Sequence, residues 1–446
     1  MAQKLFSSTE VTNAQVAYQQ GVYTLFQNKT DMWGQIKKLP ADMVNATGIQ
    51  VSFLRYANPS LSYGTGNNDA YATAGAGDYD NFTVGYVNIN AGNIQTVAGV
   101  LNSNKNTVEN MLDFELQESA KQFASFLNSY VSRGDGTMAL ATISANYSGG
   151  TPTIATCNGT TDSIGTTQLA VGGYYLFYDA TGATQRTGTV GASAIQLASK
   201  TGTACTFASN IPSDVVDTDI IVPQIGGATD ASVGLYGLPI IDDSAGTYFG
   251  KARATYGGLA SYEKTSAGTL TAGMLNETYW SIVQRGGYFT GAGASNLDDK
   301  LWTVMSTGNA QNYQSLSLNS GALVSSPQTF MHTGERPQND IGFSTHDMTW
   351  YGSPLWIANS VRGDEIYFLG KDSLRRAILK DVGDVDGRFP AGNYLQNING
   401  DGAYLQARVK MMDFFGQVYA PEPFKIGKIS GLTLVAPSQK SVMVVS

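Results

Sequence analysis

Histidine and cysteine are scarce in this chain of 446 residues. There are two of each: His332 and His346, Cys157 and Cys205. Histidine is the commonest acid–base group and metal ligand, and neither histidine has neighbours at the spacing of a zinc site, so the sequence predicts no metal centre. Two cysteines cannot build a disulfide framework. They could face each other on paired strands, but in a reducing compartment we expect free thiols.

Charged side chains are also few. Asp, Glu, Lys and Arg make up 14% of the chain, and the formal net charge is −8. Without clustered Lys and Arg, a dedicated nucleic-acid binder is disfavoured. No window approaches the roughly 18 consecutive apolar residues that a membrane span needs, and the first ten residues lack the apolar core of a signal peptide. We expect a soluble protein with no membrane partner.

Motifs of the common enzyme classes are missing as well. There is no G-x-S-x-G nucleophile elbow and no phosphate loop ending in Gly-Lys-Ser or Gly-Lys-Thr. Two carboxylate pairs remain, Asp242-Asp243 and Asp298-Asp299, for which turn and cap roles are commoner than catalysis. The sequence therefore predicts no catalytic residue and no cofactor.

What the chain does contain is glycine, tyrosine and extended segments. Residues 1–48 are typical of an arm with a short helix. Residues 49–98 hold two strand-like runs around a long polar loop, a pattern that predicts a protruding hairpin. Residues 107–132 have apolar side chains three and four apart and an acidic first half, which predicts one long helix.

The second half of the chain is richer in predicted strands. Residues 150–222 carry short Thr-, Val-, Ile- and Tyr-rich runs between glycine turns, which indicates an inserted all-β module. Helices are expected at 271–285 and at 297–305, the latter with Asn296 as its N-cap. Strands are expected at 354–358, 365–369, 377–379, 406–412 and 432–435.

The order arm, extended loop, long helix and mixed domain comes with three local motifs. These are Gly134-Asp-Gly-Thr137, the segment from Gly237 to Arg253, and Leu270-Thr-Ala-Gly-Met-Leu275. Together they resemble the major capsid proteins of tailed bacteriophages, which share the α+β Hong Kong 97 type fold. On that likeness, residues 1–48 are the N-terminal arm, 49–98 the extended loop hairpin, 99–149 the peripheral domain with its spine helix, 150–222 the inserted β module, 223–350 the axial domain, and 351–446 strands completing the peripheral and axial domains.

The resemblance implies a structural role in a virion. Copies would assemble into hexamers and pentamers of an icosahedral head around double-stranded DNA, without sequence-specific contact. A portal protein and a separate scaffolding protein are implied partners, with a decoration protein as an optional addition. Synthesis would take place in the cytoplasm of the host bacterium.

Two features of the loop bear on assembly. No lysine lies between Ile49 and Asn104, so the lysine–asparagine isopeptide bond that joins subunits in some capsids is not expected. Tyr63, Tyr71 and Tyr79 are the candidate contacts with a neighbouring subunit, since tyrosine offers a large apolar area with a polar tip.

Two other readings stay open. One is an encapsulin-like nanocompartment shell of the same fold, which loads enzymes instead of DNA. The other is a carbohydrate-binding or glycan-cleaving β protein, in which tyrosine- and asparagine-rich loops would hold sugars and paired aspartates would act as catalysts.

Overall fold

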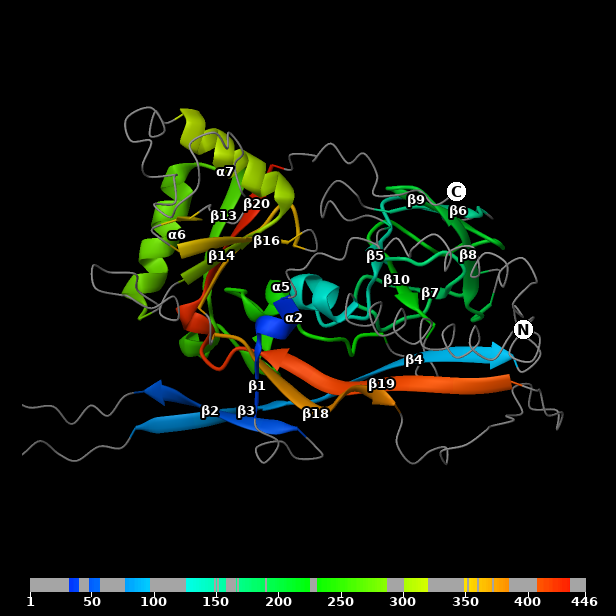
Figure 1. Cartoon of the computed structure of the whole chain (residues 1–446), viewed down its shortest axis with the longest axis horizontal. Helices are drawn as coiled ribbons and strands as arrows, with labels where there is room; N and C mark the ends of the chain where they lie inside the picture. The colour runs from blue at the N-terminus through cyan, green and yellow to red at the C-terminus, as the bar shows by residue number, and fades with distance from the viewer. Residues whose placement is uncertain are drawn as a thin grey trace, which may run out of the picture. The chain divides into compact units, whose positions relative to one another are not determined.

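The computed structural model describes a large part of the chain, and every structural statement below concerns these residues: 32–39, 48–56, 77–96, 126–147, 150, 152–157, 166, 168–188, 191–224, 231–286, 301–319, 349–350, 353–358, 361–370, 373–384 and 407–433. The chain forms two compact units. The first comprises Met1–Lys29, Tyr86–Leu127 and Ile378–Gly416, and the second Thr30–Gly85, Asn128–Ala377 and Gln417–Ser446. Figure 1 shows the elements along the chain.

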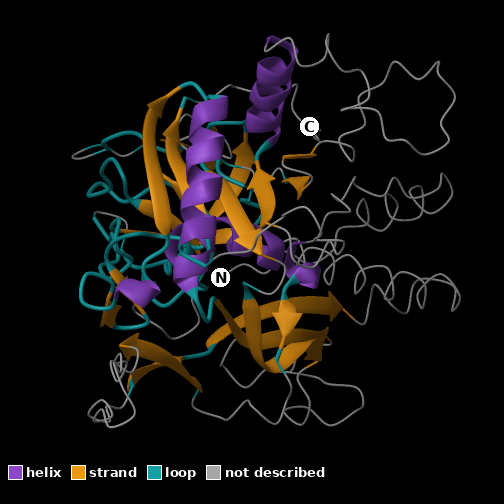
Figure 2. Ribbon diagram, turned by 90° about the vertical axis from the view of Figure 1, so that its left-hand side faces the viewer, coloured by secondary structure: helices purple, strands orange, loops and turns teal. Residues whose placement is uncertain are grey.

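A six-stranded mixed sheet forms the core of the second unit. Its strand order is β13 (Tyr262–Gly268), β20 (Gly427–Leu432), β17 (Ile366–Gly370), β14 (Leu301–Met305), β16 (Ser353–Ile357) and β15 (Thr349–Trp350). Two helices, α6 (Ala272–Gln284) and α7 (Thr307–Asn319), lie against the sheet (Figure 2). Their apolar side chains pack on one of its faces. The other face carries the polar side chains described below.

Helix α6 forms where the sequence predicts it. The side chain of Thr271 accepts a hydrogen bond from the backbone N–H of Met274, as an N-cap should. Leu275, Tyr279 and Ile282 recur at helical spacing and are buried against the sheet.

The helix predicted at 297–305 is wrong, because Leu301–Met305 is the strand β14. This strand pairs with β16 on one side and β17 on the other. Trp302, Thr303 and Val304 favour extended backbone, and pairing along both edges outweighs the local helix signals. A helix, α7, begins only at Thr307, and the proposed cap Asn296 lies outside the described residues.

The other predicted strands of the C-terminal region are confirmed, with one shift. They correspond to β16, β17, β18 (Arg375–Asp384) and β19 (Ala407–Tyr419). The last strand, β20, lies at 427–432, earlier than the expected 432–435. In the first unit, β19 pairs antiparallel with β4 (Val87–Thr96), from Ala407 opposite Thr96 to Gly416 opposite Val87.

Six short strands of the second unit form a small barrel. Their order is β5 (Ala141–Thr142), β10 (Ile220–Pro223), β7 (Tyr174–Tyr178), β8 (Ile195–Lys200), β9 (Ala204–Phe207) and β6 (Ile154–Thr156). The two end strands also meet: Ile143 forms a bridge with Cys157, and Ser144 N–H donates to the Thr156 carbonyl at 2.9 Å. The rings of Phe177 and Phe207 touch at 5.3 Å across the interior although β8 separates their strands.

The barrel includes β5, which lies before residue 150, the start that the sequence pattern predicts for the β module. Its first and last strands are neighbours, with Thr142 opposite Ile220. The other domain boundaries stay predictions.

The predicted long helix is described only at its end. Residues 126–133 are helical, and Leu127, Tyr130 and Val131 are buried there. Residues 107–125 lie outside the described part, as does most of the proposed arm.

Within residues 32–39 the chain forms a short helix, α2 (Met32–Gln35), and a strand, β1 (Lys37–Lys38), that pairs in parallel with Arg375 and Arg376 of β18. No helix in the described ranges is long and apolar enough to cross a membrane.

The packing of α6 generates a stability prediction. Leu275→Ala removes a side chain that is 1% exposed and leaves a cavity under the helix. We expect it to lower the free energy of unfolding by about 2–5 kcal/mol. Gln284→Ala, at an exposed position of the same helix, is the control and should change it by less than about 0.5 kcal/mol. Chemical denaturation measures both, and equal effects would contradict the assigned packing.

Candidate functional site

The hairpin predicted in residues 49–98 is formed by β2 (Ile49–Tyr56) and β3 (Asp78–Val84), which pair antiparallel from Ile49 opposite Val84. Its root and its far end differ sharply in burial. Ile49, Phe82 and Val84 are buried at the root, whereas Tyr79 towards the far end is 70% exposed. The connecting residues 57–76 lie outside the described residues.

This ribbon has only two strands among the described residues. A two-stranded hairpin is at best marginally stable alone, because it has no second layer against which to bury side chains. Both outer edges carry backbone groups without a neighbouring strand in the described part, and such edges are natural places for another chain to dock. The root must therefore be held by the body of the unit, while the far end is available for contact.

Aromatic rings hold the root. The ring of Phe82 stacks on Phe249 at 5.6 Å with an interplanar angle of 5°, and meets Tyr248 edge-on at 5.3 Å. On the opposite strand, Phe53 meets Tyr256 edge-on at 5.5 Å. Contacts of this kind add to the apolar burial of the rings themselves.

The partner Phe249 has an unusual backbone. It lies between β11 (Thr247–Tyr248) and β12 (Lys251–Ala252), with φ of 44°, and Gly250 follows with φ of 78°. Two successive positive φ angles are typical of the tight hairpin turn in which Asn-Gly is preferred, so Phe249 is strained there. Its ring stacks on Tyr236 at 4.5 Å as well as on Phe82, and these contacts offset the strain.

An ion pair supplements the rings. The Lys251 ammonium lies 2.9 Å from both carboxylate oxygens of Asp80 on β3. This hydrogen-bonded pair, with help from the backbone N–H of Asn81 and from Tyr256, lowers the pKa of Asp80 to about 2. Lys251 also lies 5.4 Å from the centre of the Tyr256 ring. The pair ties the middle of the hairpin to the turn that carries Phe249.

Of the three tyrosines proposed as assembly contacts, one can be placed. Tyr79 lies on β3, exposed and opposite Leu54. Tyr63 and Tyr71 lie outside the described residues. Sequence analysis missed Phe249 and Lys251, which are about 170 residues from their hairpin partners. No local signal in the sequence pointed to them, and the hairpin also carries a cation of its own, Arg55, which pairs with Asp78 at 3.4 Å.

The Asp80–Lys251 pair predicts a pH-dependent effect. Because folding lowers the pKa of Asp80, its stabilisation is complete above the unfolded pKa and is lost as the pH falls through about 2. We expect wild type to exceed Lys251→Met in denaturation midpoint at pH 6, with the difference vanishing towards pH 2. Lys264→Met, which breaks the exposed pair with Glu277, is the control. A wild-type advantage that persists unchanged at pH 2 would contradict the assignment.

A second cluster of polar side chains surrounds Asp242 and Asp243, the aspartate pair considered for catalysis. Asp242 follows the short helix α5 (Leu238–Ile241), and its N–H donates to the Leu238 carbonyl as a cap. Its carboxyl is fully buried, and neither oxygen has a hydrogen-bond partner among the described residues. Burial raises its pKa well above the usual value, and the charge of Lys428 offsets only part of that rise.

Lys428 of β20 lies at the centre of this cluster. It pairs across the sheet with Glu263 of β13 and Tyr367 of β17. Its ammonium lies 3.7 Å from a Glu263 oxygen and 3.9 Å from an Asp243 oxygen, and donates to the Pro239 carbonyl at 3.4 Å.

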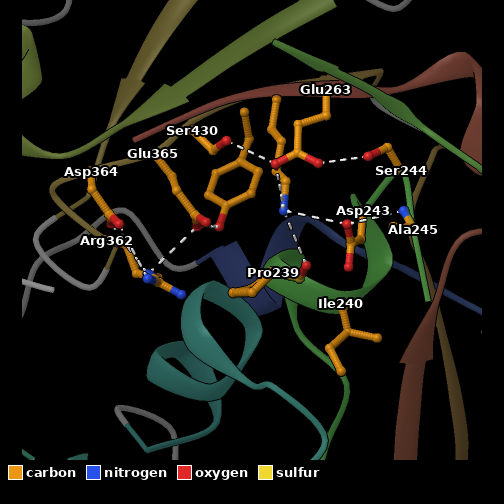
Figure 3. A network of polar contacts seen from close by, with 12 residues as sticks. Pro239, Ile240, Asp243, Ser244, Ala245, Glu263, Arg362, Asp364, Glu365 and Ser430 are labelled. Carbon is orange, nitrogen blue, oxygen red and sulfur yellow. Dashed lines mark hydrogen bonds and ion pairs between the residues drawn. The ribbon is translucent and has the colours of Figure 1, made fainter. Parts of the chain in front are cut away.

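Glu263 is the best satisfied carboxylate of the cluster (Figure 3). It accepts hydrogen bonds from Ser244 at 2.6 Å and from Ser430 at 2.8 Å. Although burial opposes its charge, these bonds and Lys428 hold its pKa below the usual value. The network thus joins α5, β13 and β20.

Beside it lies a second ionic group. Arg362 lies 3.2 Å from Asp364 and 3.7 Å from Glu365, which also accepts a hydrogen bond from the Tyr367 hydroxyl (Figure 3). Burial raises the pKa of Tyr367 well above its usual value, and the Glu365 charge adds to the effect.

This arrangement is suited to holding elements together and poorly suited to catalysis. A hydrolytic pair must reach a substrate, but Asp242 is enclosed and Asp243 is engaged by Lys428 and by the N–H of Ala245. Asp298 and Asp299 lie outside the described residues. No group of three His, Cys, Asp or Glu side chains in the described ranges could hold a metal ion.

The central position of Lys428 can be tested by a double-mutant cycle. Lys428→Met leaves the half-buried Glu263 and the buried Asp242 without the charge of this ammonium, and should lower the free energy of unfolding by about 3–5 kcal/mol. Lys425→Met, at the more exposed pair with Glu422, is the control and should change it by about 0–1 kcal/mol. Combined with Glu263→Gln, Lys428→Met should be less harmful than the two single effects added. Simple additivity would show that the two side chains do not interact.

Comparisons with known proteins identify the fold. No protein-family model and no curated protein matches the sequence. Among solved structures, a chain of the cyanophage A-1(L) capsid asymmetric unit has a TM-score of 0.51 at 12% identity, covering 93% of this chain and 95% of that one. A Gordonia phage Cozz structure has a TM-score of 0.44 at 11% identity, with coverage of 93% and 90%. The capsid of the native GTA particle has 0.44 at 9% identity, with coverage of 96% and 95%. The similarity to the cyanophage chain confirms the resemblance found in the sequence: this chain has the α+β fold of a phage capsid protein.

Proposed function

We propose that the chain is a major capsid protein of the Hong Kong 97 type, whose copies form hexamers and pentamers of an icosahedral head around double-stranded DNA. The observation that supports this most directly is the similarity to the cyanophage capsid chain, which extends over 93% of the sequence. A likeness over nearly the whole length concerns the complete architecture and not one shared motif.

The hairpin supplies the mechanical part of the proposal. Its root is fixed by Phe249 and Lys251, and its far end presents Tyr79 to solvent. In an assembled shell, a neighbouring subunit would cover this end and provide the apolar surface that the ribbon lacks. Tyr63 and Tyr71 would make further contacts of the same kind.

The remaining partners follow from the same role. A scaffolding protein would guide assembly, a portal protein would occupy one vertex, and a decoration protein could bind the finished shell. The net charge of −8 suits a shell that does not bind its packaged DNA tightly, because negatively charged protein and DNA phosphates repel each other. The chain would be made in the bacterial cytoplasm and end in the virion.

The nanocompartment alternative uses the same fold, so particle size and content separate it from a phage head. The glycan-cleaving alternative is disfavoured by the enclosed Asp242. Electron microscopy of the product, expressed with its scaffolding protein, tests all three. Closed icosahedral shells that take up DNA support the proposal, small shells with protein cargo favour the nanocompartment, and failure to form particles contradicts both.

Tyr79 provides a sharper test of the hairpin. Tyr79→Ser removes a large exposed side chain, so the monomer should keep its melting temperature. If the ring is a central contact, its loss weakens each subunit interface by about 2 kcal/mol, and shell yield should fall at least tenfold. Sedimentation and electron microscopy measure the yield. Val171→Ser, at another exposed apolar position, is the matched control. Normal shells from Tyr79→Ser would remove this residue from the interface.

The lysine-free loop predicts how shells come apart. Without a lysine between residues 49 and 104, the loop cannot form a lysine–asparagine isopeptide bond with a neighbouring subunit. Assembled particles should therefore run as single chains on a denaturing gel under reducing conditions. A ladder of covalent multimers would overturn this prediction.

A further inference from the structure

The interior of the β barrel holds both cysteines of the chain. Cys205 lies on β9 opposite Ala155 of β6, and the N–H of Cys157 donates to the carbonyl of Thr203. By this register Cys157 and Cys205 are diagonal neighbours on one face of the sheet. Phe207 shares that face, and its ring meets Phe177 in the barrel interior. The two thiols therefore face each other inside the barrel.

Their sulfur atoms are 3.7 Å apart, and the two residues are 1% and 0% exposed. The two sulfurs are not joined in a disulfide. A disulfide requires about 2.0 Å between the sulfurs, so a modest closing movement would join them. Cys157 comes directly after the last residue of β6, a strand of three residues.

The surroundings of Cys205 favour its thiolate. The hydrogen bond with Cys157 lowers the pKa of Cys205, burial opposes that change, and the charge of Lys200 adds to the lowering. Lys200 is the cross-strand partner of Cys205 and is held by the carbonyls of Thr166 and Leu169. Since the thiolate is the reactive form, these surroundings favour Cys205 as the attacking group.

We propose that Cys157 and Cys205 form a redox modification site that hydrogen peroxide converts into a disulfide across the barrel. The Cys205 thiolate attacks one peroxide oxygen and breaks the O–O bond, which gives a sulfenic acid and hydroxide. The Cys157 sulfur then attacks the Cys205 sulfur and displaces the sulfenic hydroxyl, which leaves as water with the Cys157 proton, while the hydroxide from the first step takes up the proton that Cys205 released. In sum, two thiols and one peroxide give one disulfide and two waters, so sulfur is oxidised and peroxide reduced.

The position of the pair gives the bond a structural effect. β6 has three residues, and the barrel closes at its end, because Cys157 also bridges to Ile143, the residue directly after β5. A disulfide would fasten β6 to β9 and enclose β7 and β8 in a covalent loop. Such a loop restricts the unfolded chain and should stabilise the barrel. This effect does not depend on shell assembly.

The test uses the full-length chain, reduced and then treated with hydrogen peroxide. We expect both thiols to become unavailable to an alkylating reagent in denaturant, with loss of two hydrogen atoms in the mass of the chain. The non-reducing gel should show a single chain, and the melting temperature should rise by several degrees. Dithiothreitol should reverse all of these changes.

Two matched variants separate the roles of the cysteines. Cys157→Ser should leave a sulfenic acid on Cys205, trapped by dimedone, with no rise in melting temperature. Cys205→Ser should react severalfold more slowly, because the thiol whose pKa is lowered is gone. The proposal is overturned if peroxide leaves both wild-type thiols open to alkylation, or adds oxygen without removing two hydrogens. Because the wild-type measurement needs no variant and no particles, it stands even if a variant misfolds or shells fail to form.

Discussion

A ribbon of two strands has no interior, and the structure around β2 and β3 is arranged to supply one. The buried root residues find their second layer in rings contributed by a turn nearly 170 residues further along the chain. That turn places Phe249 at a positive φ angle, where glycine or asparagine is normally preferred. Stacking of its ring on Phe82 and on Tyr236 offsets the backbone strain. The hairpin and the turn stabilise each other, so each would be weaker alone.

The two faces of the mixed sheet are covered by side chains of different kinds. One face is closed by α6 and α7 with apolar side chains, whereas the other carries Lys428 and Glu263 in a cross-strand pair. A buried charge is tolerated only when it is paired and hydrogen-bonded. The serine hydroxyls on either side of Glu263 meet this requirement and fix the position of α5 relative to the sheet.

Much of the fold could be predicted from sequence where the signals are local. The helix at 271–285, the two strand-like runs of the hairpin and the β-rich runs of the barrel all depend on neighbouring residues. The prediction failed at Leu301–Met305, where pairing on both edges decides the conformation. The partners of the hairpin could not be predicted, because contact between Asp80 and Lys251 is a product of the tertiary fold. Tyr79 could be chosen by residue type, but only the structure establishes its exposure.

The barrel enters and leaves the rest of the chain at adjacent backbone positions, since Thr142 and Ile220 lie opposite each other. A segment whose two ends are neighbours can be gained or lost in a gene without redirecting the polypeptide on either side. The barrel segment meets this condition. Its loops are suitable sites for carrying a foreign peptide, and related genes can be expected to differ in this segment while keeping the sheet and the hairpin.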